Sequence, residues 1–376
     1  MRKGLSVLKQ CIPARATLPI LAYAQVRGDN GVLTAEVTDL DVWGVWEEGG
    51  YAGVPLNCCL PLARLIAVVE DEVPRFQCGE KAEAVVVESS GIMEELYSWP
   101  VDEFPARPDR GEIVARIPGA AFAQALGKVA YDIGLGCTRE CLNGLQITVR
   151  DGWTVLAASD GSRLAVSCCG GEGKAEAVVP RKAILALQAA LEAAPTDSVN
   201  VWWWEKPVGD STSSYVWFQA GPWKIGARLL DGDHFPDWKD VVVSKPVKGT
   251  EPSPWYQVTC DRKAMIKAMT SVGRYSVGDK NDGGNVMVKV LWGREEIKLS
   301  ASSVERGSGK AVVACQRSEA GEEIEMGLNW RSCVDALRVM ETKEVGFVIK
   351  AARRPVNFVE DGCVIGVVMP MRMEGM

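Results

Sequence analysis

Histidine is nearly absent from this sequence, because His234 is the only one in 376 residues. The chain has 12 cysteines, but no pair has the C-x-x-C spacing, so a tetrahedral zinc site lacks its usual ligands. Neither a G-x-S-x-G nucleophile motif nor a P-loop occurs. We therefore expect no catalytic residue, no metal site and no cofactor, and we interpret the cysteines as small core residues of a reducing cytosol.

Long apolar runs are also missing. No run of about 18 apolar residues occurs, so we expect no membrane span. The first 21 residues begin with basic side chains, but Lys9 and Arg15 interrupt the apolar part, which argues against a signal peptide. These features favour a cytoplasmic protein.

Positive charge is in deficit. The formal net charge is −7, which argues against a protein that grips nucleic acid by bulk charge alone. Charge can still be gathered on one face of a fold. Hydrophobic residues make up 47% and charged residues 24% of the chain, the balance of an ordinary folded protein.

One order of elements occurs three times along the chain: a helix, strands about a turn, a second helix and a proline-containing segment. This repeat predicts an α+β protein of three similar domains, each with two helices packed on antiparallel sheets. The expected domains are 1–112, 113–248 and 249–376. The expected helices lie at 5–12, 60–70, 119–131, 179–191, 260–272 and 327–340, and the expected strands lie at 31–46, 142–150, 153–168, 285–292, 295–303 and 364–368.

Helix boundaries have their own signals. Pro61 and Pro180 suit a first helical position, and Asp261 and Asn329 suit N-caps. Basic residues recur on the expected helices, which predicts either ordinary solvated faces or a basic surface within an acidic protein. The basic residues that we single out on these helices are Lys128, Arg181, Lys182, Lys263 and Lys267.

Eight segments together resemble the bacterial sliding clamp, the β subunit of DNA polymerase III, in order and spacing. They cover nearly the whole chain and are TLPIL (17–21), VTDLDV (37–42), CLNGL (141–145), ASDGSRLAV (158–166), VVPRKAI (178–184), LLDGDHFPDW (229–238), MGLNW (326–330) and VVMPMRM (367–373).

The resemblance implies a head-to-tail homodimer that forms a six-domain ring around double-stranded DNA, with helices lining the hole. The five basic helix residues singled out above, together with Arg15, would contact the DNA backbone without reading sequence. Arg15 and Lys182 match DNA-contacting positions of the family. Val272 and Gly273 match positions at the dimer interface, and glycine at 273 in place of a larger apolar residue predicts a weakened dimer.

The resemblance also implies a surface pocket, built partly by the C-terminal tail between the second and third domains, for short peptides of the replicative polymerase, the clamp loader and repair proteins. Methionines suit a site with several partners because their side chains adapt. Arg163 and Arg372 would supply polar recognition. The expected apolar residues are Leu164, Pro236, Val241, Val367 and Met369, their surroundings are Ser159, Gly161, Arg163, Pro370, Met371 and Arg372, and a neighbouring subsite comprises Arg139, Leu142 and Asn329.

Asp160-Gly161 also fits a hairpin turn with positive φ, and the equivalent Asp39-Leu40 should carry no pocket. The family's opening strand is expected to be missing or reduced before the first helix. Glu70 and Asp240 replace basic residues found in relatives, which affects the predicted DNA contacts. Two alternatives to a clamp are a clamp-like scaffold that binds peptides without encircling DNA, and an enzyme, which the absence of motifs disfavours.

Overall fold

The structure is a computed structural model and describes residues 1–79, 83–208, 211–230, 234–242, 256–276, 286–318 and 322–373. Contacts divide the chain into two compact units. Unit 1 comprises Met1–Leu126, Leu135–Leu156 and Cys168–His234, and unit 2 comprises Gly127–Gly134, Ala157–Ser167 and Phe235–Met376. Both units combine antiparallel sheets with a few helices, so the predicted α+β class is confirmed. The three domain boundaries stay a prediction.

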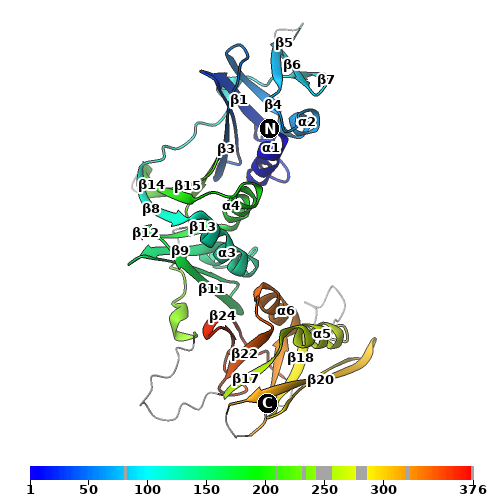
Figure 1. Cartoon of the computed structure of the whole chain (residues 1–376). Coiled ribbons are helices and arrows are strands. Elements are labelled where there is room, and N and C mark those ends of the chain that lie inside the picture. The colour runs from blue at the N-terminus through cyan, green and yellow to red at the C-terminus, as the bar shows by residue number, and fades with distance from the viewer. Residues whose placement is uncertain are drawn as a thin grey trace. The chain divides into compact units, whose positions relative to one another are not determined.

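A nine-stranded antiparallel sheet forms the framework of unit 1 (Figure 1). Its strands, in spatial order, are β12 (Glu172–Gly173), β8 (Glu112–Pro118), β14 (Ser198–Val208), β15 (Ser211–Ala220), β16 (Trp223–Arg228), β3 (Val42–Gly49), β2 (Val32–Thr38), β1 (Tyr23–Asp29) and β4 (Leu56–Pro61). The β16–β3 pair joins strands from either side of residue 112 in one sheet. Apolar side chains on both faces of these strands are fully buried, such as Ile225 on one face and Val45 on the other.

A small sheet, four further strands and four helices complete the described part of unit 1. A three-stranded sheet has the order β5 (Arg75–Cys78), β6 (Ala84–Ser89) and β7 (Ile92–Tyr97). The remaining strands that contribute residues are β9 (Gly144–Arg150), β10 (Trp153–Ser159), β11 (Arg163–Gly170) and β13 (Ala175–Pro180). The helices are α1 (Arg2–Leu8), α2 (Leu62–Val68), α3 (Gly119–Val129, through Leu126) and α4 (Arg181–Ala193), of which α1 and α4 contact each other and β3 (Figure 1).

Unit 2 is a second antiparallel layer covered by two helices. Its strands follow the order β24 (Cys363–Val368), β23 (Val356–Glu360), β22 (Glu344–Ile349), β17 (Tyr256–Asp261), β20 (Gly307–Arg317), β19 (Glu296–Ser303), β18 (Met287–Trp292) and β21 (Ile324–Asn329). Helices α5 (Arg262–Gly273) and α6 (Trp330–Val339) lie side by side on this layer (Figure 1). Met265, Trp292 and Phe347 belong to the core between helices and strands.

Short 3-10 helices occupy several connections. They are η1 (Lys9–Cys11), η2 (Pro19–Ala22), η3 (Val101–Glu103), η4 (Ala130–Asp132), η5 (Glu140–Asn143) and η6 (Trp238–Asp240).

The six predicted helices are confirmed, with boundaries that differ by a few residues. Asp261 and Asn329 are N-caps, since the side chain of Asp261 accepts the Ala264 amide and that of Asn329 accepts the amides of Arg331 and Ser332. The expected first helical position of Pro61 and Pro180 is wrong. Both are N-caps, with ψ values of 112° and 140°, because each residue still pairs in the preceding strand.

A strand edge is the simpler expectation for three consecutive tryptophans, but the Trp202-Trp203-Trp204 run lies in the interior of the nine-stranded sheet, and all three residues are half-buried. β14 pairs with both β8 and β15. Trp202 packs on the cluster of Trp43, Val45 and Trp217. Trp204 contacts the ring of Tyr215, with centroids 5.4 Å apart. Because side chains alternate along β14, Trp202 and Trp204 share one face, and both have partners within unit 1.

Two turns show the predicted repeat at the level of single hydrogen bonds. The Ser159 hydroxyl donates to the Arg163 carbonyl at 2.6 Å and accepts the Gly161 amide at 3.1 Å. Thr38 makes the same two bonds, to the Val42 carbonyl at 2.9 Å and from the Leu40 amide at 2.9 Å. The predicted positive φ at Gly161 is confirmed at 93°, and Leu40 adopts 85°. Since positive φ disfavours leucine, the hydrogen bonds hold the first turn in place.

Gly273 generates a stability prediction for unit 2. A Cβ at this position would lie 2.4 Å from the Trp330 ring, so the ring or the helix backbone would have to shift. We expect Gly273→Ala to lower the free energy of unfolding by about 1–3 kcal/mol because of this overpacking. Urea denaturation followed by tryptophan fluorescence measures the change.

Gly127→Ala is the matched control. Gly127 lies in α3 with no atom within 4 Å of an added Cβ, so alanine should stabilise by about 0.5–1 kcal/mol. Equal effects of the two substitutions would contradict the role of Trp330.

Candidate functional site

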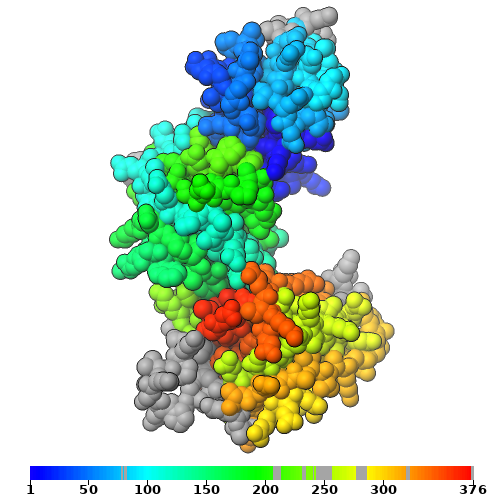
Figure 2. All heavy atoms as spheres, in the orientation of Figure 1, coloured from blue at the N-terminus to red at the C-terminus, as the bar shows by residue number. Residues whose placement is uncertain are grey.

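The C-terminal segment runs along the surface of unit 2 beside α6 (Figure 2). β24 is the predicted final strand and pairs with β23 and with the start of β11, so that Val367 lies opposite Leu164. Beyond the strand, the Met369 amide donates to the Ser162 carbonyl at 2.9 Å and the Met371 amide donates to the Gly327 carbonyl at 2.8 Å. The tail is therefore fixed on both sides of Pro370, while Met369 and Met371 keep 41% and 36% of their surface exposed.

Leu164 and Val367 belong to one apolar cluster. They are 5% and 2% exposed, and Phe235, Trp238 and Val242 pack against them. Of the other residues predicted for the apolar pocket, Pro236 is half-buried and Val241 is 37% exposed. The segment that carries both is bent back by η6, since the amides of Val241 and Val242 both donate to the Trp238 carbonyl.

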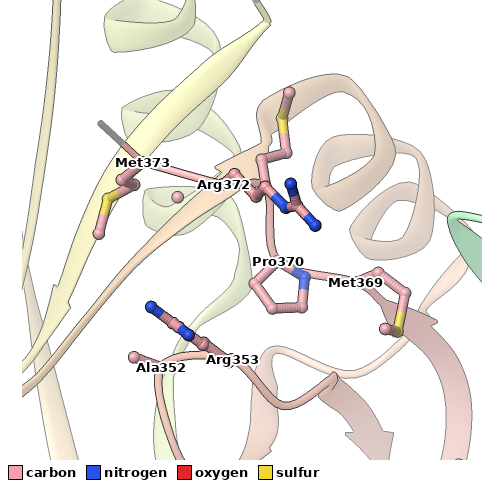
Figure 3. A pocket seen from close by; sticks show the side chains of 8 residues that line it. Ala352, Arg353, Met369, Pro370, Arg372 and Met373 are labelled. Carbon is pink, nitrogen blue, oxygen red and sulfur yellow. The ribbon is translucent and has the colours of Figure 1, made fainter. Parts of the chain in front are cut away.

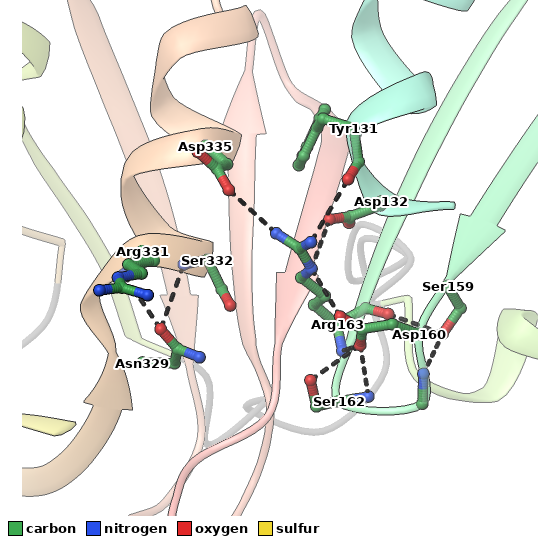
Figure 4. A network of polar contacts seen from close by, with 11 residues as sticks. Tyr131, Asp132, Ser159, Asp160, Ser162, Arg163, Asn329, Arg331, Ser332 and Asp335 are labelled. Atoms are coloured by element: carbon green, nitrogen blue, oxygen red, sulfur yellow. Dashed lines mark hydrogen bonds and ion pairs between the residues drawn. The ribbon is translucent and has the colours of Figure 1, made fainter. Parts of the chain in front are cut away.

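Arg163 lies at the centre of a polar network (Figure 4). Its Nε is 2.9 Å from Asp132 Oδ1 and 2.8 Å from Asp160 Oδ2, and its Nη1 is 3.1 Å from Asp335 Oδ2. Nη2 donates to the Tyr131 carbonyl at 3.3 Å. The guanidinium is thus engaged by three carboxylates from three segments. Polar recognition of a peptide by Arg163 stays a prediction, and its visible role is to hold the 159–163 turn against η4 and α6.

Asp132 is the buried member of this network. Its residue exposure is 2%, and its Oδ1 accepts no hydrogen bond from the described residues. Burial raises the pKa of Asp132 to about 8, although Arg163 acts in the opposite direction. One guanidinium cannot neutralise three carboxylates, so the most buried one holds a proton near neutral pH.

A pocket of about 440 Å³ adjoins the tail (Figure 3). Its lining consists of residues 369–373 together with Gly327, Ala352 and Arg353. Met369, Pro370, Met371 and Arg372 were predicted as site residues, and the structure brings them together here. Arg353 was missed. The basic pair Arg353-Arg354 before Pro355 was the available signal in the sequence.

The remaining residues of the predicted subsite fall in different units. Arg139 and Leu142 belong to unit 1, where Arg139 Nη2 donates to the His234 carbonyl at 3.0 Å and the Leu142 amide donates to the Arg139 carbonyl at 3.1 Å. Asn329 belongs to unit 2, where it caps α6. The sequence did not indicate that the backbone carbonyl of His234 is the partner of Arg139.

Lys182 and Lys128, two of the candidate DNA-contacting residues, form ion pairs within the chain. Lys182 forms an ion pair with Asp39, and Lys128 Nζ lies 3.1 Å from Glu360 Oε2. Burial would raise the pKa of Glu360, but hydrogen bonds from the Thr342 and Glu341 amides and from Lys128 lower it. The other candidates differ in exposure: Arg15, Lys263 and Lys267 are exposed, and Arg181 is half-buried.

Val272 and Gly273, predicted at a dimer interface, are both buried in unit 2. Val272 is 2% exposed and lies in the core cluster. Glycine at 273 has a cause inside this chain, because the Trp330 ring fills the space of a side chain. Both the weakened dimer and the interface role of the two residues stay predictions.

Within the described ranges, no helix is long and apolar enough to cross a membrane. Among the same residues, no group of three or more His, Cys, Asp or Glu side chains is arranged to hold a metal ion.

Comparison with known families places the chain. The family model for the DNA polymerase III beta subunit, central domain, matches residues 116–237, and the model for the C-terminal domain of the same subunit matches residues 256–372. Together these matches cover well over half of the chain. The protein therefore belongs to the DNA polymerase III β-subunit family.

Individual relatives agree with this assignment over the full length. The chain is 23% identical to the beta sliding clamp of Proteus mirabilis, covering 99% of this chain and 97% of that protein, and 24% identical to that of Streptomyces coelicolor. The crystal structure of the β subunit from Thermotoga maritima matches with a TM-score of 0.82 at 20% identity, and that of the Bartonella birtlesii clamp bound to griselimycin with 0.82 at 22%. These structures support the fold.

The buried Asp132 generates a pH prediction. Its folded pKa of about 8 exceeds its ordinary value of 3.8, so the fold favours the protonated form. The resulting stabilisation is complete below about pH 4 and is lost as the pH rises toward 8, by at most about 1.4 kcal/mol per pH unit. Asp132→Asn should therefore gain stability relative to the native chain between pH 5 and 8, measured by urea denaturation.

Asp160→Asn is a control of opposite sign. Burial alone would raise the pKa of Asp160, but hydrogen bonds from Ser162 and the Arg163 charge lower it, so its stabilisation is lost on acidification. A pH-independent difference between Asp132→Asn and the native chain would show that Asp132 is ionised throughout.

Proposed function

We propose that this chain is a DNA sliding clamp, a processivity factor that encircles duplex DNA and tethers the replicative polymerase. The observation that carries the proposal is the full-length similarity to proteins named beta sliding clamp, which covers 97–99% of this chain in the relatives cited above. The clamp loader and repair proteins would dock on the same tail surface through short peptides. The chain itself would be a non-catalytic subunit that acts in the cytoplasm.

The proposed ring consists of two chains with domains 1–112, 113–248 and 249–376, joined head to tail. Two strand edges support such an arrangement. β7 is the end strand of its sheet, and residues 307–314 of β20 pair only with β19 among the described strands. Unpaired edges favour pairing with another chain. β7 exposes Glu94 and Glu95 with apolar Met93, whereas the β20 edge exposes Lys310 with Arg306 just before it.

The closed ring would hold duplex DNA because it encircles it, and the contacts of basic side chains with the DNA backbone would be weak. Exposed Lys263 and Lys267 on α5, with Arg15, are the residues that we propose for those contacts. Lys128 and Lys182 would first have to give up their carboxylate partners, which makes them weaker candidates. A net charge of −7 would discourage DNA binding elsewhere on the surface.

Retention on circular DNA tests the function. When dimers re-form around nicked circular DNA, the complex should survive about 1 M salt, because a closed ring needs no electrostatic contact to stay on. Linearising the DNA should release the protein by sliding off the ends. Gel filtration of the labelled protein with the DNA measures retention.

Lys263→Glu combined with Lys267→Glu is the control. It should reduce low-salt affinity for DNA without changing retention on the circle. Equal loss from circular and linear DNA at high salt would favour the clamp-like scaffold that does not encircle DNA.

Charge reversal tests the head-to-tail contact. Glu94→Lys with Glu95→Lys should weaken the dimer about tenfold or more, because like charges would then face each other across the interface. Arg306→Glu with Lys310→Glu should do the same, and the four changes together should restore the dimer. Light scattering across a dilution series measures the mass against twice 40.7 kDa.

The restoration is the decisive observation. If both double variants are monomeric and the fourfold variant is monomeric as well, β7 and β20 do not face each other in the dimer.

A further inference from the structure

The lining of the pocket beside the tail has an excess of positive charge. Arg353 and Arg372 both contribute to its lining, and the lining contains no acidic residue. Neither arginine forms an ion pair with a carboxylate in the described part of the chain, and both are exposed. By contrast, Arg163 in the same unit has three carboxylate partners.

The rest of the lining is apolar and preformed. Met369, Met371 and Met373 lie around Pro370, and the backbone on both sides of Pro370 is hydrogen-bonded to Ser162 and Gly327. A Cβ at Gly327 would meet Met287 Sδ at 2.4 Å and Met373 Cγ at 3.1 Å, so methionines pack closely over this glycine. The pocket therefore offers an apolar recess whose floor does not have to fold on binding.

The two arginines reach this recess from different segments. Figure 3 shows the Arg372 side chain above the Pro370 ring and the Arg353 side chain to the left of it. Arg353 belongs to the turn before β23, which the Arg354 amide closes by donating to the Ala351 carbonyl at 3.0 Å. An extended ligand that places an apolar side chain against the methionines would thus meet guanidinium groups from two directions.

We infer that this pocket selects acidic peptides, that is, segments with an apolar anchor flanked by carboxylates, and that Arg353 determines the preference. The inference rests on the proposed peptide-docking function of the tail surface and specifies its ligand. Guanidinium groups bind carboxylates with paired hydrogen bonds, and complementary charge raises the rate and specificity of association. Single-stranded DNA also carries negative charge, but a methionine and proline lining fits an apolar side chain better than a nucleotide.

Three labelled peptides test the inference by fluorescence anisotropy. Each carries leucine and phenylalanine, flanked by two aspartates, two asparagines or two lysines. The native chain should bind the aspartate peptide about 5- to 20-fold more tightly than the asparagine peptide at 50 mM salt, and less selectively at 500 mM, because salt screens exposed charges. Arg353→Glu should abolish the preference for the aspartate peptide, because the new carboxylate offsets the charge of Arg372.

Arg294→Glu is the matched control, since Arg294 is an exposed arginine of unit 2 outside the pocket lining and the charge change is the same. It should keep the preference of the native chain.

The outcomes separate the inference from the function beneath it. Equal binding of the aspartate and asparagine peptides, or an unchanged order in Arg353→Glu, overturns the inference while peptide docking stands. If none of the three peptides binds, peptide docking itself fails. If Arg353→Glu weakens binding of single-stranded DNA and leaves the peptide order unchanged, the arginine serves nucleic acid and the inference is wrong.

Discussion

Arg163 contacts Asp132, Asp160 and Asp335 and so joins three segments that are distant in sequence. These are η4, the 159–163 turn and α6. Because a buried charge is costly without partners, these groups hold one another in place. The Ser162 carbonyl of this turn accepts a hydrogen bond from the Met369 amide, which fixes the start of the tail. The shape of the tail surface therefore depends on a guanidinium that lies beneath it.

The same turn geometry occurs at Thr38–Val42, where it has a different use. There Asp39 pairs with Lys182 in unit 1, and no arginine follows the turn. Both turns satisfy their backbone through a hydroxyl and a carboxylate, which explains why the motif can repeat while its surroundings change. A repeated local structure thus has different charged partners in its two copies, and the prediction that only the second copy carries a pocket stays a prediction.

In this protein, the roles of charged side chains depend more on whether they have ion-pair partners than on the net charge. Lys128 and Lys182, both candidates for DNA contact, are paired with carboxylates, while exposed Lys263 and Lys267 on α5 and the two pocket arginines have no such partners among the described residues. The same principle separates Arg163, which stabilises the fold, from Arg353, which is available to a ligand. Net charge and residue type alone do not distinguish these roles.

The sequence by itself determined the six helices, the caps at Asp261 and Asn329, the turn at Gly161 and the final strand, because each depends on periodicity or on a local backbone hydrogen bond. The resemblance of eight short segments also led to the family. Tertiary structure decided which charged groups pair, why glycine stands at 273, and that Arg353 reaches the tail pocket. Those features depend on side chains far apart in the chain, whose separation in space no local pattern encodes.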